Sequence, residues 1–352
     1  MRRILKIAKA ELFTLFYSPV AWLILVAFTV QVGLKFTGLM ADFVYREDMG
    51  FGNGFLTANL LGGMFGLYNT VQQYLYLYMP LLTMGLMSRE FSSGSIKLLY
   101  SSPVTSSQIV MGKFLAMMAY GLVLLGTLIL YIGYAACVVD NFAFAEALSG
   151  LLGLYLLLCA YAAIGLFVSC LTSYQTLIIL AVLNYMNQVW QDIAFVRDIT
   201  YWLCLSGRTN EMISGLLCSE DILYFVIVIS MFLLLSILKL QSTRQRVSFS
   251  MVWGKYLGVV VIAMLLGFVT SRPVMMCYYD ATETKRNTLT PNSQEVMSKL
   301  EGGMTITTYV NFLDRDYYIG MPNMVNSDLE RFKQYLRFKP EIKMKYVYYY
   351  DS

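Results

Sequence analysis

Histidine is absent from this 352-residue sequence, and charged residues make up only 14% of it. Without histidine the chain has no imidazole for acid–base catalysis and cannot build the usual histidine-containing zinc and haem sites. Ser-His intramembrane proteolysis and histidine-dependent membrane acyl transfer are excluded for the same reason. The six cysteines form no Cys-x-x-Cys pair, so the sequence indicates neither a disulfide framework nor a metal or redox motif.

Apolar side chains are abundant instead. Hydrophobic residues account for 58% of the sequence, whereas soluble domains contain about 45–50%. A soluble chain of this length cannot bury so much apolar surface, so most of it must face lipid. The net charge of +4 is too small to indicate a nucleic-acid partner. We therefore expect a polytopic α-helical membrane protein in a lipid bilayer.

Seven apolar segments are long enough, or nearly so, to cross a hydrocarbon core of about 30 Å. They lie at residues 19–40, 70–87, 114–136, 147–169, 174–191, 222–238 and 254–271. With the N-terminus inside, the inner segments hold eleven basic residues, and the outer loops before the last span hold four. Because basic residues concentrate on the cytoplasmic side, the N-terminus is predicted to be cytoplasmic and the C-terminal segment periplasmic.

The segment after the seventh span, residues 272–352, is polar and holds 11 of the 26 basic and 10 of the 22 acidic residues. Its predicted elements are a helix that begins at Thr290-Pro291, a strand over 304–311, a helix over 327–338 and a strand over 342–350. These elements predict a partial α/β domain. About 80 residues is little for an independent core, so we expect a truncated domain.

The predicted inner loop between the second and third spans has an unusual pattern. Arg89-Glu90 ends an apolar helix at the membrane surface, Gly94 breaks the helix, and Pro103 ends the short apolar segment that follows. Such an element can lie flat under the bilayer and contact a cytoplasmic partner, or it can be a simple interfacial loop. The candidate contact residues are Arg89, Glu90, Gly94, Lys97, Leu98, Leu99, Pro103 and Lys113.

This loop closely resembles the signature of ABC-2 type transporter permeases. The matching residues are Arg-Glu, then Gly-Ser, then Lys-Leu-Leu-Tyr-Ser-Ser-Pro-Val, and finally Gly-Lys before a span. Ala10-Glu11-Leu12 with 16–22 is similar to the interfacial helix of that family. The resemblance covers about residues 1–240. It implies that the loop docks on a cytoplasmic ABC ATPase subunit and that the permease works as a homodimer or heterodimer.

The sequence has no ATP site of its own. Gly121 and Gly126-Thr127 imitate the glycine spacing of a phosphate-binding loop, but the lysine is missing and the segment lies inside a span. These glycines are expected to permit close helix packing instead. ATP and Mg are therefore expected on a separate ATPase chain, and this chain is expected to be neither an enzyme nor the holder of a cofactor.

The C-terminal segment resembles a second family. The run Asp280-x-Thr282-x-x-Lys285-Arg286-x-Thr288-Leu289-Thr290 is similar to the start of the auxiliary domain of gliding-motility-type ABC systems of Bacteroidetes. Asn287 stands where that pattern usually has Tyr, and Thr290 where it has Ser. The two resemblances together imply a permease domain over 1–245, a linker with a seventh anchor span over 246–271, and an auxiliary domain over 272–352 in the periplasm. The membrane implied is the cell inner membrane.

The predicted fifth span carries a polar stripe. Amide side chains in lipid must find partners, so this face points to another helix or to a substrate path, and both alternatives are open. The stripe residues share one helical face and are Asn184, Asn187, Gln188 and Gln191. Gln72 and Gln73 open the second span and can be interfacial. Cys204 and Cys218 in the outer loop either form a disulfide or are two free buried thiols.

Three classes of function fit a chain of this kind to different degrees. The first is the membrane subunit of an ABC-2 exporter or of a gliding-motility-type ABC complex. The second is a non-transporting membrane scaffold that presents an extracytoplasmic domain to partners. The third, a membrane enzyme, would need paired carboxylates or a Ser-Lys pair in the bilayer, but the spans contain no acidic residue deep inside.

Overall fold

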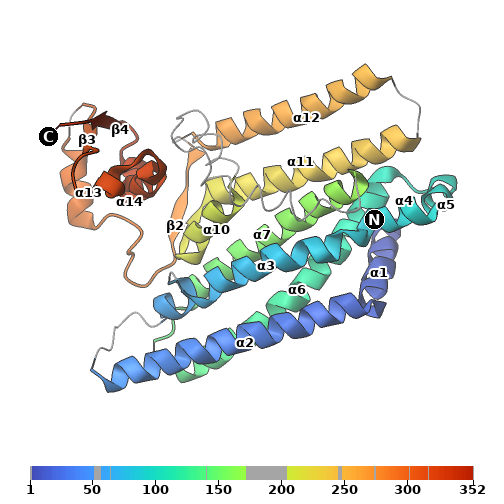
Figure 1. Cartoon of the computed structure of the whole chain (residues 1–352), viewed down its shortest axis with the longest axis horizontal. Coiled ribbons are helices and arrows are strands. Elements are labelled where there is room, and N and C mark those ends of the chain that lie inside the picture. The colour runs from blue at the N-terminus through green and yellow to red at the C-terminus, as the bar shows by residue number, and fades with distance from the viewer. Residues whose placement is uncertain are drawn as a thin grey trace.

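The computed structural model describes residues 2–50, 57–63, 65–139, 141–171, 204–244, 248–272, 275–300, 302–315 and 317–351. Most of these residues form helices that run side by side (Figure 1). The elements up to residue 270 are α1 (Arg2–Tyr17), α2 (Pro19–Asp48), the π-helical turn η1 (Ala58–Gly62), α3 (Leu67–Thr83), α4 (Gly85–Ser93), α5 (Ile96–Ser101), α6 (Ser106–Val138), α7 (Phe144–Leu171), α10 (Leu205–Ile213), β1 (Leu216–Cys218), α11 (Ser219–Arg244) and α12 (Phe249–Thr270).

Within the described ranges, five helices are long and apolar enough to cross a membrane: α2, α6, α7, α11 and α12. Their apolar helical segments have 21 to 33 residues, which corresponds to about 30 to 50 Å. These five helices coincide with five of the seven predicted spans. The chain is therefore a polytopic α-helical membrane protein. The predicted fifth span, 174–191, lies outside the described residues.

The second predicted span, 70–87, is not one helix. It covers α3, which has 17 residues, and the beginning of α4. The break falls at Met84, four residues after Pro80 and directly before Gly85. Pro80 disturbs only the turn before it, and the Met84 N–H still bonds the Pro80 carbonyl at 2.9 Å; the low helix propensity of Gly85 weakens the helix at this point.

The corner between α1 and α2 has a local cause. Ser18 precedes Pro19 and has an extended backbone (φ −80°, ψ 127°), and proline disfavours the helical conformation of the residue before it. Pro19 then begins α2 at a position where the missing N–H costs nothing. The Trp22 indole donates to the Phe16 carbonyl at 2.7 Å across the corner. Thus α1 is held as a separate helix at an angle to the bundle (Figure 1).

Helix α7 lies at the centre of the bundle. Of its most apolar 18-residue window 72% is buried, against 11% for α12. It packs against α3, α6, α10 and α11. Close approach depends on glycine: a Cβ on Gly150 would lie 2.2 Å from the Tyr68 ring, and one on Gly121 would lie 2.3 Å from Leu158. Among the described residues nothing lies within 4 Å of a Cβ on Gly126, so the packing role expected for these glycines is confirmed for Gly121.

The C-terminal segment, residues 275–351, will be called the tail. Its described elements are β2 (Tyr278–Asp280), α13 (Pro291–Ser298), β3 (Thr305–Asn311), the 3-10 turns η4 (Tyr317–Gly320) and η5 (Pro322–Met324), α14 (Val325–Phe338) and β4 (Lys343–Tyr349). The four elements predicted from sequence correspond to α13, β3, α14 and β4. Strands β3 and β4 pair in parallel through the α14 crossover, from Thr305 opposite Lys343 to Asn311 opposite Tyr349.

The bundle has two distinct ends (Figure 1). One end carries α1, α4 and α5, and will be called the α1 end. The opposite end carries α10, β1, β2 and the rest of the tail, and will be called the tail end. Strand β1 pairs antiparallel with β2, so the tail is joined to the bundle by backbone hydrogen bonds. Described charged residues that are buried lie at the two ends, at Lys113, Glu146, Arg208, Asp221 and Asp280.

Gly150→Ala is expected to lower the free energy of unfolding by about 1–3 kcal/mol, because its new methyl group has no room beside Tyr68. Gly126→Ala is the matched control, since nothing lies within 4 Å of that position. Thermal unfolding of both variants in the same lipid nanodiscs is the measurement. Equal stability of the two variants would contradict the packing of α7 against α3.

Candidate functional site

The candidate contact residues lie together at the α1 end, on α4, α5 and the start of α6. Gly94 ends α4 with a left-handed backbone (φ +72°), a conformation that glycine adopts without strain. A capping box then begins α6: Thr105 Oγ1 accepts from the Gln108 N–H, and Gln108 Oε1 accepts from the Thr105 N–H, both at 3.3 Å. These signals isolate α5 as a short separate helix.

Helix α5 is fixed to the bundle from two sides. Arg244, at the end of α11, donates to the carbonyls of Tyr100 at 2.9 Å and Val104 at 3.3 Å. Arg3, from α1, donates to the Pro103 carbonyl at 2.6 Å. Cationic donors satisfy carbonyls that a helix C-terminus leaves unpaired. The position of α5 therefore depends on two helices that lie far from it in the sequence.

The outer surface of this segment is open to solvent. Leu98 is 74% exposed, and Arg89, Lys97 and Pro103 are also exposed. Leu99 is half-buried. An exposed leucine next to a lysine on an anchored helix offers both apolar area and charge to a partner.

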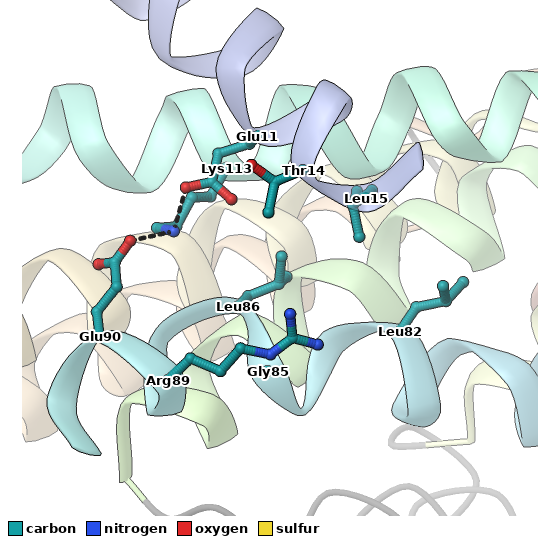
Figure 2. Close-up of a pocket in the computed structure, with 9 residues that line it drawn as sticks. All are labelled: Glu11, Thr14, Leu15, Leu82, Gly85, Leu86, Arg89, Glu90 and Lys113. Carbon is teal, nitrogen blue, oxygen red and sulfur yellow. Dashed lines mark hydrogen bonds and ion pairs between the residues drawn. The ribbon is translucent and has the colours of Figure 1, made fainter. Parts of the chain in front are cut away.

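Lys113 and Glu90 are not on that surface. The Lys113 side chain is 2% exposed, and its ammonium lies 2.5 Å from Glu11 Oε1 and 2.7 Å from Glu90 Oε1 (Figure 2). This three-residue group, the Lys113 cluster, joins α1, α4 and α6. Burial raises the pKa of the Glu90 carboxyl, and the Lys113 ammonium opposes that shift. The cluster therefore lies behind the exposed surface, where it ties three helices together.

A cavity of about 220 Å³ adjoins the Lys113 cluster. It opens between α1, α3, α4 and α6, and is lined by Glu11, Thr14, Leu15, Leu82, Gly85, Leu86, Arg89, Glu90 and Lys113 (Figure 2). Within the described ranges, the Glu90 Oε2 atom is buried without a hydrogen-bond partner. Space next to a buried charge group leaves room for α1 and α4 to shift relative to each other.

Helix α4 is also bound to the end of α7. Ser169 Oγ accepts from the backbone N–H groups of Met87 at 2.9 Å and Ser88 at 3.1 Å, and donates to the Met84 carbonyl at 3.0 Å. One hydroxyl thus satisfies the backbone at the break between α3 and α4. The contact attaches the predicted loop to the central helix.

The polar residues predicted in the second and fifth spans differ in what the structure shows of them. Asn184, Asn187, Gln188 and Gln191 lie outside the described residues. Gln72 is buried, and its side-chain amide donates to the Ser206 carbonyl at 3.1 Å, so it joins α3 to α10 and is not merely interfacial. Gln73 is exposed.

Cys204 and Cys218 are free and buried, which is the second of the two alternatives for these residues. Cys218, Glu211 and Asp221 bring one potential metal ligand each within 4.8 Å of one another. However, Lys333 and Arg337 bind the Glu211 carboxylate, and Arg208 binds Asp221 at 3.0 Å. Arg337 and Arg208 already neutralise the two carboxylates, so the group does not fit a divalent metal.

Comparison with protein families identifies the chain. The family model described as "ABC-2 family transporter protein" matches residues 5–200, more than half of the sequence. The chain belongs to the ABC-2 family of transporter proteins. It is therefore the membrane component of an ABC-type transporter, a role that implies an ABC ATPase as its partner. The match includes the elements from α1 to α7, and the tail lies outside it. No curated protein shows a significant match to the sequence.

Glu11 is the member of the Lys113 cluster that sequence reasoning did not select. It lies 102 residues from Lys113 in the chain, so no local spacing joins the two. One signal was available, because Glu11 is the single acidic residue of an otherwise basic α1. An acidic residue in that position needs a local cation.

Lys113→Met is expected to destabilise this ABC-2 permease by about 3 kcal/mol, because it leaves two largely buried carboxylates without their cation. Lys97→Met is the control, since that lysine is exposed and its loss should change stability by less than about 0.5 kcal/mol. Unfolding in nanodiscs distinguishes the two. Adding Glu11→Gln and Glu90→Gln to Lys113→Met should recover most of the loss, and a failure to recover would show that the lysine acts through packing instead.

Proposed function

We propose that this ABC-2 permease couples to an ATPase on a separate chain through the surface from Arg89 to Pro103. The proposal rests on one observation: Lys97 and Leu98 are exposed on α5, and Arg3 and Arg244 hold this helix in place. A fixed surface loses little conformational entropy when a partner docks, so more of the contact energy remains for binding.

A defined set of contacts leads from this surface into the membrane. Displacement of α4 would reach α6 and α1 through the Lys113 cluster, and α7 through Ser169. ATP hydrolysis on the partner would thereby shift the populations of inward- and outward-facing states, because each state would make different contacts with the ATPase. ATP and Mg bind the partner in this proposal, and this chain performs no hydrolysis itself.

The proposed orientation places the α1 end in the cytoplasm and the tail in the periplasm of a cell with an inner membrane. Arg3, Lys97 and Arg244 lie at the α1 end, in agreement with the excess of basic residues on the cytoplasmic side. Two permease copies are proposed to act with two ATPases, as the family resemblance implies.

The tail is proposed to be an auxiliary domain of the gliding-motility type, fused to the permease. Its run from Asp280 to Thr290 supports this assignment, whereas the family match ends before it. The alternative function is a scaffold that presents the tail to an extracytoplasmic partner and moves no substrate. The scaffold does not require a docked ATPase at α5, so the partner at α5 separates the two functions.

The combined variant Lys97→Glu and Leu98→Asp is expected to reduce co-purification of a P-loop ATPase at least about tenfold, because it reverses the charge and removes the apolar contact. Leu313→Asp is the control, since Leu313 is 61% exposed in the tail. The measurement is affinity purification from native membranes with quantitative mass spectrometry. Equal ATPase recovery from both variants would place the docking surface elsewhere, and no ATPase with the unmodified chain would favour the scaffold.

A further inference from the structure

The loop that joins the tail to the bundle begins with Asp280, around which the run from Asp280 to Thr288 folds. Asp280 is 5% exposed. Its Oδ1 accepts from the N–H of Thr282 at 3.0 Å and from its hydroxyl at 2.6 Å, and its Oδ2 accepts from the Asn287 N–H at 2.9 Å and the Thr288 hydroxyl at 3.3 Å. One carboxylate thus organises a tight loop through charge-assisted hydrogen bonds.

The loop directs two side chains at the bundle. Arg286 Nη2 donates to Glu146 Oε1 at 2.6 Å, and Asn287 Nδ2 donates to the Ser214 carbonyl at 2.8 Å. Glu146 is 3% exposed and begins the central helix α7. Among the described residues, Arg286 is its one ion-pair partner. A buried carboxylate without a cation is strongly destabilising, so the bundle depends on a charge that the tail supplies.

The turn after α10 is shaped to receive this loop. Gly215 has a left-handed backbone (φ +91°), and a Cβ there would lie 2.7 Å from Thr282 and 3.1 Å from Glu146. The Ala281 N–H donates to the Gly215 carbonyl at 2.8 Å, next to the β1–β2 pair. The position requires glycine both for its backbone conformation and for the close approach of the tail.

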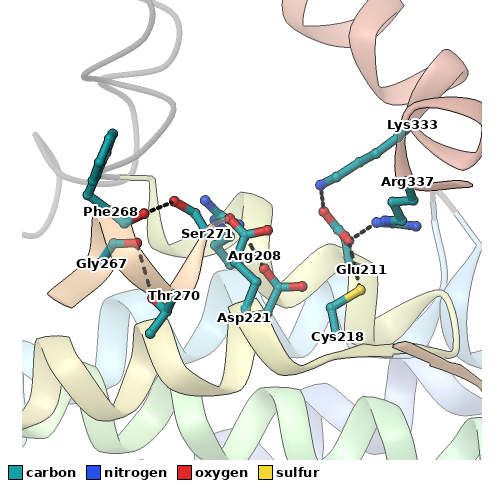
Figure 3. Close-up of polar contacts among 11 residues, drawn as sticks. Arg208, Glu211, Cys218, Asp221, Gly267, Phe268, Thr270, Ser271, Lys333 and Arg337 are labelled. Atoms are coloured by element: carbon teal, nitrogen blue, oxygen red, sulfur yellow. Dashed lines mark hydrogen bonds and ion pairs between the residues drawn. The ribbon is translucent and has the colours of Figure 1, made fainter. Parts of the chain in front are cut away.

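A second contact fixes the tail from α14. Figure 3 shows Lys333 and Arg337 converging on Glu211, which belongs to α10. The Glu211 side chain is 17% exposed, so the ion pairs are largely shielded from water. The tail therefore contacts the bundle at three places: the Arg286 loop, the β1–β2 strand pair, and Lys333 with Arg337 of α14.

The geometry points to a rigid clasp: the run Asp280–Thr288 locks the tail to α7 and to the α10–β1 turn, so that these elements move as one body. This inference gives the run a mechanical role that the resemblance does not assign. Three contacts, two built on ion pairs and one on backbone hydrogen bonds, would all have to break before the tail could separate. Any displacement of α7 is then carried to the surface of the tail. That last step rests on the proposed function, whereas the clasp itself does not.

Stability tests the clasp without reference to transport. Arg286→Gln is expected to lower the Tm in nanodiscs by about 5 °C or more, because Glu146 loses its cation. Glu146→Gln added to Arg286→Gln should restore most of the loss by removing the unpaired charge. Lys299→Gln is the control, since the Lys299–Glu295 pair is about 70% exposed and its loss should leave the Tm unchanged. An Arg286→Gln variant as stable as Lys299→Gln overturns the clasp.

An engineered disulfide tests whether the tail stays docked on the bundle. Cys218 stands opposite Tyr278 in the β1–β2 pair, and the neighbouring Ser219 N–H bonds the Cys277 carbonyl at 2.8 Å. Residues 218 and 278 are therefore a non-hydrogen-bonded pair, whose Cα atoms lie about 4.5 Å apart in such ladders, within disulfide range. Tyr278→Cys, with the exposed Cys137 and Cys277 changed to Ser, allows Cys218 to be oxidised to a disulfide with residue 278 by copper phenanthroline.

In the complex with its ATPase, the crosslinked permease is expected to hydrolyse ATP at a rate within about twofold of the reduced form. The reason is that a disulfide between strands that stay paired restricts no motion that turnover requires. Adding Cys218→Ser provides the control for oxidation itself. Loss of turnover that dithiothreitol reverses would show that the tail must undock, which overturns the rigid clasp. If no ATPase binds the chain, the proposed function fails. The Tm values of the Arg286→Gln series then test the clasp by themselves.

Discussion

The arrangement of this molecule depends on the cost of burying charge in a chain that is mostly apolar. An ionised group taken out of water must meet an opposite charge or it destabilises the fold. Lys113 meets Glu11 and Glu90 at the α1 end, and Glu146 meets Arg286 at the tail end. Each pair joins elements that are more than 100 residues apart or belong to different helices. The ion pairs therefore help to fix α4 and the tail, which lie at opposite ends of the bundle.

Helix α7 connects these two ends. It has 28 residues, so it extends about 42 Å, and it contacts α4 through Ser169 and the tail through Glu146. Gly150 and Gly165 of α7 allow α3 to pack closely against it, and Gly121 of α6 allows α6 to approach Leu158 of α7. A rigid, central helix with polar contacts at both termini can carry a displacement from one side of a membrane to the other. This geometry gives an ABC-2 permease a direct physical connection between the proposed docking surface and the tail.

Hydrophobic length and local capping made much of the fold predictable. Five spans follow from apolar runs, and the helix at Pro291 follows from its cap, since Thr290 Oγ1 accepts from the Ser293 N–H. The break at Met84 was missed because an apolar run does not reveal where its helix is interrupted. The pairs Lys113–Glu11 and Glu146–Arg286 were missed for another reason. Ion pairs across more than 100 residues leave no periodic signal, so only the packing of the helices brings them together.

A photo-crosslinking amino acid placed at Leu98, compared with the same group at Leu313, tests the coupling surface in native membranes. ABC-2 membership leads us to expect that the probe at Leu98 crosslinks to a P-loop ATPase, while the probe at Leu313 does not reach one. The crosslinked peptides, identified by mass spectrometry, would locate the contact on both chains. An ATPase captured from Leu313 and not from Leu98 would contradict both the docking surface and the orientation of the chain in the membrane.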